Sequence, residues 1–321
     1  MDIEWDCIVV GGGAAGLSAA LVLGRARRRT LVVDAGVPSN LAAHGIGGLL
    51  GHDGRPPAQL YATGRTELAA YPNVRIVDGE VVAGTPVGDG FVLEMADGTH
   101  EHARRLLLAT GMEYRPPRIP GLDELWGNSA FHCPFCHGWE VRDQPLAVLA
   151  QGERAAHSAL LLRGWTDDIV VLTNGPADMD ATVRGRLTAA GVSVDERVVR
   201  EFVSEDGELA SIEFSDGPAL ARRGVLVTTT LHQRSNLAAQ LGVDVAPPGP
   251  VAADAVAIDP FHRTSTPGVF AAGDVSAQMP QVAAAVAAGS MAAAAVVQSL
   301  LADDVGLPVL PWPNQKEDAH V

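Results

Sequence analysis

Cysteine is scarce in this sequence, with three among 321 residues: Cys7, Cys133 and Cys136. A tetrahedral zinc site usually needs four ligands, most often supplied as two Cys or His pairs. Only one such pair is present, and a site made from it and the flanking His132 and His137 would strain so short a loop. Cys7 stands in the apolar run "DCIVVGG", where cysteine typically behaves as a small buried hydrophobe. We therefore expect no metal site.

Positive charge is also scarce. The chain holds 23 Lys and Arg against 38 Asp and Glu, a formal net charge of −15, and Lys316 is its one lysine. Such a charge repels phosphates, which argues against nucleic acids and anionic membrane surfaces as partners. Hydrophobic residues make up 47% of the chain, which favours a sizeable core over disorder, and the length suits two domains.

A basic leader is missing as well. The sequence starts "MDIEWDCIVVGGG" and runs directly into a strand pattern, so we expect no signal peptide and a cytoplasmic protein. In the cytoplasm a CxxC pair is more often redox-active or metal-binding than a structural crosslink. A redox-active pair needs a partner for its electrons, which the rest of the chain must bind.

The N-terminal segment "WDCIVVGGGAAGLSAALVLGRARRRTLVVDAG" reads as a strand, a glycine loop, a helix and a second strand. Gly11, Gly13 and Gly16 match GxGxxG, which allows a tight turn, close approach of a pyrophosphate, and packing of the helix on the sheet. Asp34 ends the second strand, where an acid takes ribose hydroxyls. A glycine turn without a ligand is the weaker alternative. The cofactor contacts predicted here are Gly11, Gly13, Ala14, Ala15, Gly16, Asp34 and Ala35.

Two distant segments indicate which dinucleotide this is. In "RRLLLATGMEYRPP" an apolar strand ends at residues 109–111, and in "GVFAAGDVSAQMPQVAAAV" a strand ends at residues 273–274 before an Ala-rich helix. Together these segments resemble the FAD signatures of flavoprotein reductases with two dinucleotide folds. The resemblance implies that FAD binds, and that its contacts here include Ala109, Thr110, Gly111, Gly273, Asp274, Gln281 and Val282.

The same resemblance assigns roles to these contacts. Asp274 would contact the ribityl or phosphate region, and the helix start at Gln281 would face the pyrimidine end, where its dipole stabilises a reduced flavin. The segment "AAHGIGGLLGHDGRPPAQL" is similar to the flavin-facing loop. Further implied FAD contacts are Asn40, His52, Asp53 and Val82. The Ala-rich run approaches the length of a membrane span, but alanine is weakly apolar and the run begins at a cofactor loop, so we expect no membrane span.

The position of the CxxC pair in the middle of the chain resembles the low-molecular-weight thioredoxin reductases. That resemblance implies an α/β protein with two Rossmann-like, three-layer domains, the second inserted into the first. Residues 1–115 and 246–321 would form the FAD domain, and residues 116–245 an inserted NADPH-domain-like domain that carries Cys133 and Cys136. The family is usually homodimeric, so we expect a homodimer.

The sequence departs from that family where NADPH should bind. In "AQGERAAHS" the first glycine is Ala150, Gly152 survives, Ala155 closes the motif, and Glu153 puts a carboxylate where a pyrophosphate would lie. After the next strand, residues 173–175 replace the arginine pair that reads a 2′-phosphate, and residues 230–232 replace a glycine beside the nicotinamide. We predict that the inserted domain keeps its fold and has lost tight NADPH binding.

A further departure follows the cysteines. His137 stands where thioredoxin reductases have an aspartate that donates a proton, and histidine can both take and give protons near neutrality. Packing or loop capping is the simpler alternative for His137, and His132 is an equally open case. These departures resemble the FAD-dependent dithiol oxidases that close disulfides in natural products such as gliotoxin, holomycin and the dithiolopyrrolones.

That resemblance implies an oxidising mechanism. A small dithiol, as thiolate, attacks the Cys133–Cys136 disulfide at Cys133, and its second thiol resolves the mixed disulfide. Cys136 passes the electrons to FAD, O₂ reoxidises the flavin to give H₂O₂, and His137, with His132, deprotonates the thiols, because only the thiolate attacks.

Two alternatives stay open. In the first, ferredoxin, a deazaflavin or weakly bound NADPH reduces the FAD, and the cysteine pair reduces a thioredoxin-like protein. An acidic ferredoxin would be repelled by the net charge of −15. In the second, the protein is a non-catalytic flavoprotein that binds a partner or senses redox state, which the intact CxxC pair makes the weakest of the three.

Overall fold

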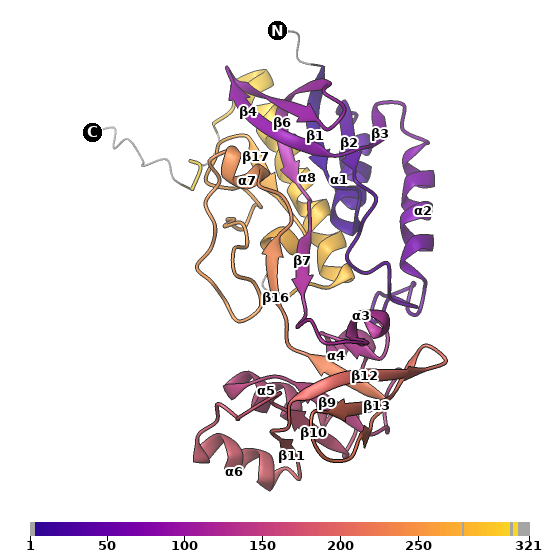
Figure 1. Ribbon diagram of the computed structural model, residues 1–321. Helices are drawn as coiled ribbons and strands as arrows, with labels where there is room; N and C mark the ends of the chain where they lie inside the picture. Colours follow the sequence, from indigo (N-terminus) through magenta and orange to yellow (C-terminus); the bar gives the residue numbers. More distant parts are fainter. Residues whose placement is uncertain (1–3, 278, 309–310, 314–321) are drawn as a thin grey trace, which may run out of the picture. The chain divides into compact units, whose positions relative to one another are not determined.

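The computed structural model describes residues 4–277, 279–308 and 311–313. These residues form two compact units (Figure 1): unit 1 comprises those within 1–39, 58–114 and 231–321, and unit 2 comprises residues 40–57 and 115–230. The units differ from the predicted domains in two places, since residues 40–57 pack with unit 2 and unit 1 resumes at Leu231. The units are defined by packing contacts. The boundaries predicted for the two nucleotide-binding folds stay a prediction.

Unit 1 is built on a sheet with strand order β3-β2-β1-β6-β5-β4, and β17 also pairs with β6. β1, β2, β3, β17 and the second half of β6 are parallel, whereas β4 and β5 are antiparallel. Apolar runs such as "CIVV" and "LVV" form the central strands because both of their faces are covered. The strands are β1 (Trp5–Val10), β2 (Thr30–Asp34), β3 (Val74–Asp78), β4 (Val81–Val87), β5 (Gly90–Met95), β6 (His100–Leu108) and β17 (Val269–Ala271).

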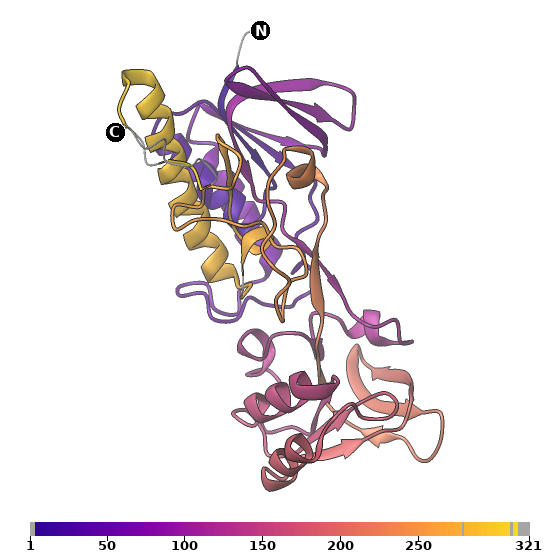
Figure 2. The same ribbon diagram turned by 90° about the vertical axis from the view of Figure 1, so that its left-hand side faces the viewer.

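Two helices, α1 (Ala14–Arg25) and α8 (Val282–Val305), pack side by side on one face of this sheet, as Figures 1 and 2 show. They approach closely: a Cβ on Gly289 would lie 2.0 Å from the Ala15 carbonyl oxygen. By length and composition, α8 is the one helix among the described residues that could cross a membrane. Its inner face, however, packs against α1, and Ser18 Oγ donates a hydrogen bond to the Val286 carbonyl at 2.7 Å.

On the other face, apolar side chains of the central strands share one core with those of β4, β5 and α7 (Leu237–Gln240). Cys7 faces the helical side, is fully buried, and has a pKa raised by burial, as the sequence predicted for a small hydrophobe in a strand. The remaining short elements of unit 1 are α2 (Pro57–Leu68) and the 3₁₀ turn η1 (Asp274–Ser276).

Unit 2 contains a parallel sheet with strand order β11-β10-β9-β15-β8. Helices α5 (Gly152–Leu162) and α6 (Ala181–Ala189) pack on one face, and an antiparallel sheet of β12, β13 and β14 packs on the other. The helix–sheet–sheet layering confirms the predicted α/β fold class. The strands are β8 (Ala130–Phe131), β9 (Leu146–Leu149), β10 (Ile169–Leu172), β11 (Ser193–Asp195), β12 (Val199–Glu205), β13 (Glu208–Phe214), β14 (Leu220–Ala221) and β15 (Gly224–Val227).

The chain passes between the units within β7 (Met112–Arg115) and β16 (Thr230–Gln233), which pair with each other as a separate two-stranded sheet. Two one-turn helices complete unit 2: α3 (Leu122–Leu125) and α4 (Pro134–His137). The chain also enters and leaves unit 2 at residues 40 and 57, so it crosses between the units four times.

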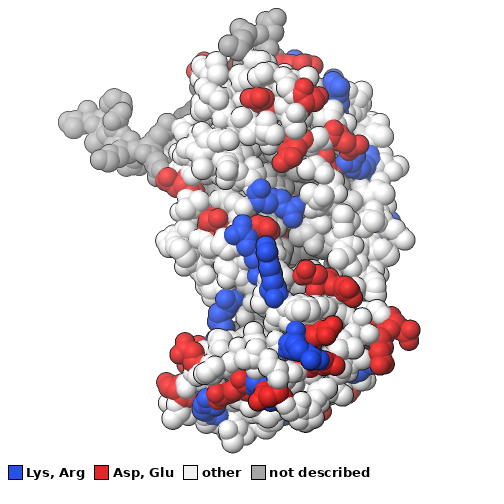
Figure 3. All heavy atoms as spheres, in the orientation of Figure 1, with Lys and Arg blue, Asp and Glu red and all other residues white. Residues whose placement is uncertain are grey.

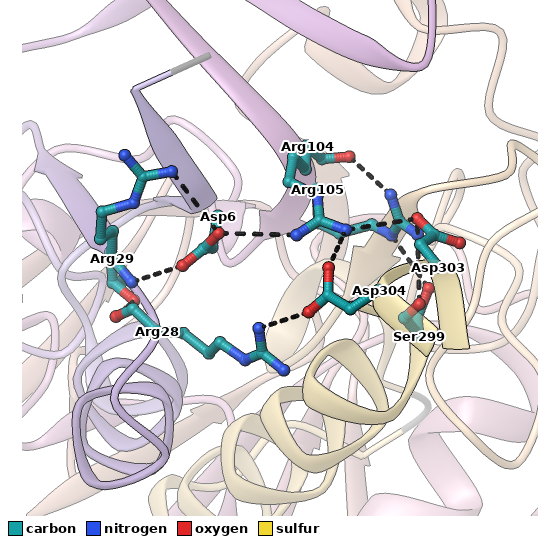
Figure 4. Close-up of polar contacts among 9 residues, drawn as sticks. Asp6, Arg28, Arg29, Arg104, Arg105, Ser299, Asp303 and Asp304 are labelled. Atoms are coloured by element: carbon teal, nitrogen blue, oxygen red, sulfur yellow. Dashed lines mark hydrogen bonds and ion pairs between the residues drawn. The ribbon is translucent and has the colours of Figure 1, made fainter. Parts of the chain in front are cut away.

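Charged side chains of unit 1 form a network at the end of α8 (Figure 4). Asp304 accepts hydrogen bonds from Arg28 at 3.0 Å and from Arg104 at 2.7 Å, and Arg105 pairs with Asp303. Carboxylates are unfavourable at the C-terminal end of a helix dipole, and these arginines offset that effect. The pKa of Asp304 is lowered, first by Arg28 and then by Arg104. Many basic side chains on the face in Figure 3 likewise lie beside acidic ones.

Candidate active site

The two cysteines of the CxxC pair lie at the start and the third position of one helical turn. Cys133 caps α4, Pro134 occupies the first helical position, and the N–H groups of Cys136 and His137 both donate to the Cys133 carbonyl at 3.2 Å. Proline suits this position because its fixed φ is already helical and it lacks the N–H that would have no partner there. The turn therefore holds both sulfurs on one short, ordered element.

Both cysteines carry thiols in this structure. The pKa of Cys133 is lowered, mainly by a hydrogen bond from the Cys136 thiol; burial opposes this, and the backbone N–H groups of Cys136 and Phe135 add to it. Because the thiolate is the reactive form of cysteine, this lowering favours the reactive form of Cys133.

The backbone of α4 lies directly against the segment of residues 40–57. A Cβ on Gly47 would lie 2.4 Å from the Cys136 carbonyl oxygen, and a Cβ on Gly127 would lie 3.1 Å from Ala42. The N–H of His44 also donates to Asn128 Oδ1 at 3.3 Å. The segment that sequence reasoning assigned to flavin contacts thus also supports the cysteine turn, and the importance of Gly47 was missed because no local pattern marks it.

The predicted FAD contacts in that segment have their own partners in unit 2. Asp53 Oδ1 accepts the Gly48 N–H at 2.8 Å, His52 Nδ1 lies 3.1 Å from an Arg55 guanidinium nitrogen, and the Asn40 carbonyl accepts the Ala43 N–H at 3.0 Å. These contacts shape the loop. The roles of these side chains toward FAD stay predictions.

The His137 ring is held mainly by stacking and burial. It stacks on Phe131 with ring centroids 5.8 Å apart, and both ring nitrogens are buried with no hydrogen bond of good geometry to any described residue. Burial lowers the pKa of His137, an effect that the backbone of Gly127 and the charge of Glu140 partly offset and that His44 adds to. The ring is therefore neutral at neutral pH, the form that accepts a proton.

His132 has a different environment. Its ring stacks on Trp126 with centroids 6.0 Å apart, and burial, followed by the charge of His137, lowers its pKa to about 4. A group with so low a pKa is a weak base near neutrality. Of the two predicted acid/base residues, His137 is the better suited. Across the described residues no three His, Cys, Asp or Glu side chains gather as a metal site requires, and the prediction of no metal stays a prediction.

The GxGxxG turn of unit 1 has the tight approaches that its glycines predict. A Cβ on Gly16 would lie 1.8 Å from the Gly11 carbonyl oxygen, and one on Gly11, at φ +113°, would lie 2.2 Å from the Ala109 carbonyl oxygen. A Cβ on Gly13 meets nothing within 4 Å. No space is therefore left beside Gly11 and Gly16, where the backbone packs tightly, whereas the space beside Gly13 is free. A pyrophosphate at the start of α1 would need that free space.

Asp34 lies at the end of β2 as predicted, and it has a partner that sequence reasoning missed. Arg65 of α2 pairs with Asp34 and also with Asp78, the latter at 2.9 Å, and the Gly36 N–H donates to Asp34 at 2.9 Å. The predicted ribose acid is therefore anchored by an arginine. Ala14 and Ala15 begin α1, and Ala35 follows Asp34 directly.

Asp274 is the most unusual carboxylate of unit 1. Burial raises its pKa to about 6, although a hydrogen bond from the Tyr114 hydroxyl at 3.2 Å and the charge of Arg234 both lower it. A buried carboxylate needs hydrogen-bond donors, and the hydroxyls of a ribityl chain would supply them. The residues present therefore fit FAD. Tyr114 and Arg234 were not predicted.

The other predicted FAD contacts lie after β6, after β17, in β4 and at the start of α8 in unit 1. Ala109, Thr110 and Gly111 follow β6, and Gly273 follows β17, where its Cβ would lie 2.8 Å from Ala15. Val82 lies in β4, in the antiparallel part of the sheet, and is half-exposed. Gln281 is the residue before α8 and Val282 is its first residue. The carboxyl ends of β1, β6 and β17 thus bring the glycine loop, residues 109–111 and Asp274 together.

The second nucleotide loop, in unit 2, keeps its turn and changes its chemistry. Gly152, at φ +59°, begins α5, and Ala150 and Ala155 are buried in the places of glycines. Glu153 pairs with Arg186 of α6 at 2.6 Å. The fold of the loop is therefore retained, while its first helical turn carries a carboxylate.

Comparison with known proteins agrees with this geometry. The family described as pyridine nucleotide-disulphide oxidoreductase matches residues 5–289. The thioredoxin reductase tcpT of Claviceps purpurea is 33% identical over 93% of this chain and 95% of its own. The crystal structure of HlmI is 38% identical, covers 94% of each chain, and has a TM-score of 0.89. An oxidoreductase from Agrobacterium tumefaciens is 37% identical over 93% of this chain and 99% of its own, with a TM-score of 0.87.

Proposed function

Because the chain belongs to the pyridine nucleotide-disulphide oxidoreductase family, we propose that it is an FAD-dependent oxidase that forms an intramolecular disulfide in a small dithiol. The chain is a thioredoxin reductase-like disulfide oxidoreductase, of a kind that typically binds FAD. One observation supports the proposed oxidase activity in particular. His137, one residue after the thiol pair, has a buried, neutral ring without a hydrogen-bonding partner among the described residues, which suits it to take protons from incoming thiols.

The proposed reaction starts from the Cys133–Cys136 disulfide. A substrate thiol loses its proton to His137 and attacks the Cys133 sulfur, which forms a mixed disulfide and releases the Cys136 thiolate. The second substrate thiol then attacks the substrate sulfur of the mixed disulfide, and this step closes the product disulfide and releases Cys133. The enzyme gains two electrons, and one proton from each substrate thiol is released.

The residues that would hold FAD are the glycine loop from Gly11 to Gly16, Asp34 and Asp274. FAD, when bound, accepts the two electrons of the cysteine pair and passes them to O₂, which yields H₂O₂. The chain itself orients the cysteine turn through Gly47 and manages the protons through His137.

A second candidate function runs in the reducing direction. It is favoured by the names of several relatives, such as the 33% identical thioredoxin reductase tcpT. In it, another donor or weakly bound NADPH would reduce the FAD, and Cys133 would reduce a thioredoxin-like protein. The neutral His137 serves this direction less well, because a reductase needs a proton donor next to the flavin-facing sulfur.

The proposal also includes a homodimer in the cytoplasm. Met291, Leu301 and Val305 on the outer face of α8 are exposed apolar side chains, and a second copy of the chain would cover them. Sedimentation of the purified protein over a range of concentrations tests this part separately from the chemistry.

Peroxide formation tests the proposed activity. We expect the purified protein to release one H₂O₂ for each dithiol oxidised, with dithiothreitol as the probe substrate. Cys133→Ser and Cys136→Ser should each abolish turnover, whereas Cys7→Ser, a change at a buried thiol outside the site, should keep turnover in the folded protein. Oxidation of dithiol at the wild-type rate by either CxxC variant would exclude the mechanism.

A further inference from the structure

One side chain joins the turns that follow β9 and β10 in the inserted unit. Gln151 Nε2 donates to the Thr173 carbonyl at 2.5 Å and to the Pro176 carbonyl at 3.3 Å, and Gln151 Oε1 accepts the Asp178 N–H at 3.0 Å. Both ends of the amide are therefore used, and the turn between β9 and α5 is fastened to the turn between β10 and α6.

The Gln151 bridge lies where a dinucleotide would bind. In open parallel sheets, ligands bind beyond the carboxyl ends of the strands, where the strand order reverses. β9 is such a strand, since β10 and β11 extend the sheet on one side of it and β15 and β8 on the other. Gln151 follows β9, Thr173 follows β10, and a Cβ on Gly152 would be 3.4 Å from the Asp178 carbonyl oxygen. The second turn thus lies over the glycine that a pyrophosphate would approach.

The turn after β10 is itself tightly held. Thr173 Oγ1 donates to the Gly175 carbonyl at 2.7 Å, and Asn174 Oδ1 accepts the Val199 N–H at 2.8 Å. Asn174 and Gly175 have φ values of +51° and +123°, which set the course of the chain. The bridge from Gln151 therefore joins a preformed turn and does not depend on a mobile one.

Two carboxylates near the bridge also disfavour the binding of a nucleotide phosphate. The Glu153 carboxylate stands in the first turn of α5, paired with Arg186 at 2.6 Å. The Glu196 carboxylate accepts the Ala177 N–H at 3.2 Å and pairs with Arg184 at 2.6 Å. Both carboxylates flank the bridge and occupy nearby arginines that could otherwise pair with phosphate.

We propose that Gln151 is a specificity-determining residue that closes the crevice of the inserted fold and so excludes pyridine nucleotides from it. The side-chain amide takes the place of the ligand that usually spans these two turns. The proposal does not rest on the direction of electron flow, because a reductase supplied by ferredoxin or a deazaflavin would need the same closure.

Amide hydrogen exchange in the full-length holoprotein tests the bridge itself. Gln151→Ala removes three hydrogen bonds, so exchange at Asp178 should be faster by about tenfold, the effect of roughly 1.4 kcal/mol of local opening. The matched control is Gln240→Ala, since Gln240 makes a comparable bridge in unit 1 to the Gly84 N–H at 3.1 Å and the Val82 carbonyl at 3.3 Å. Unchanged exchange at Asp178 in Gln151→Ala would overturn the proposal.

Equilibrium dialysis against NADH and NADPH then tests the exclusion. We expect the wild type to bind neither at about 1 mM, and the double variant Gln151→Gly, Glu153→Gly to bind at least one of them with a Kd of that order or tighter. Wild-type binding with a Kd in the micromolar range would overturn the proposal. Fast exchange at Asp178 in the double variant without nucleotide binding would also overturn it, because closure would then not be the cause of exclusion.

Discussion

Gly47 lies directly against the backbone of Cys136: a Cβ at position 47 would be 2.4 Å from the Cys136 carbonyl oxygen and 3.2 Å from its Cα. The two residues belong to segments far apart in the chain, and the contact fixes the cysteine turn from outside. Because a disulfide exchange requires the sulfurs in line, even a small displacement of this turn affects the rate.

Replacing Gly47 tests this contact. Gly47→Ala should shift the backbone at Cys136 and slow dithiol oxidation by about 10–100-fold, while the FAD content stays at the wild-type level. The rate is measured as peroxide release and the FAD content by absorbance. Gly185→Ala in α6 is the control, since a Cβ there meets nothing within 4 Å. Equal rates for the two variants would show that Gly47 has no positioning role.

The second prediction concerns His137 and pH. Burial lowers its pKa below the ordinary value of 6.5, so the neutral ring persists to lower pH than in a free histidine. Turnover should fall as the pH drops through this lowered pKa, because the protonated ring cannot accept a proton. His137→Asn should lack this limb and be about 100-fold slower at neutral pH. A variant with an unchanged pH profile would remove His137 from the proton path.

His132 gives a prediction about stability. Its pKa falls from 6.5 to about 4 on folding, so the unfolded chain binds the proton more tightly. The free energy of unfolding is therefore highest above pH 6.5, where the His132 ring is neutral in both states. It decreases by up to about 3 kcal/mol as the pH falls toward 4. His132→Phe keeps the stacking on Trp126 and removes the titration. Urea denaturation between pH 4 and 7 should therefore show a shallower acid loss for the variant, and parallel curves would contradict the assignment.

Tyr114 should matter for cofactor affinity. Its hydroxyl donates to the buried Asp274 at 3.2 Å and helps to keep that carboxylate charged for a flavin hydroxyl. Tyr114→Phe should raise the pKa of Asp274 further and weaken FAD binding by about 3- to 10-fold, the value of one hydrogen bond. Flavin fluorescence on dilution measures this affinity. Tyr71→Phe, whose hydroxyl accepts a hydrogen bond from Arg25 at the surface, is the control and should leave the affinity unchanged.

Features with a local pattern could be predicted from the sequence. The α/β class, the resemblance to thioredoxin reductase-like flavoproteins and an oxidoreductase activity are confirmed. Gly11 and Gly16 were predictable because a strand, a glycine turn and a helix follow one another directly, and each glycine has its own steric reason. Cys7 was predictable as a buried strand residue because the run around it is apolar throughout.

Features made by distant segments could not be predicted. Nothing near Gly47 in the sequence indicates that it touches Cys136, and nothing near Arg65 indicates that it anchors Asp34. The same holds for Gln151, which stands at a variable position of the glycine motif, although its amide makes a specific bridge. Such contacts depend on how loops fold over strand ends, which periodicity does not encode.

Anaerobic spectroscopy of the flavin tests the central claim most directly. The purified protein would be mixed separately with dithiothreitol and with NADPH, and its visible flavin absorption followed. A dithiol oxidase should be bleached by the dithiol and not by NADPH, with colour and peroxide returning on exposure to air. Rapid bleaching by NADPH, or no bleaching by the dithiol, would contradict this claim.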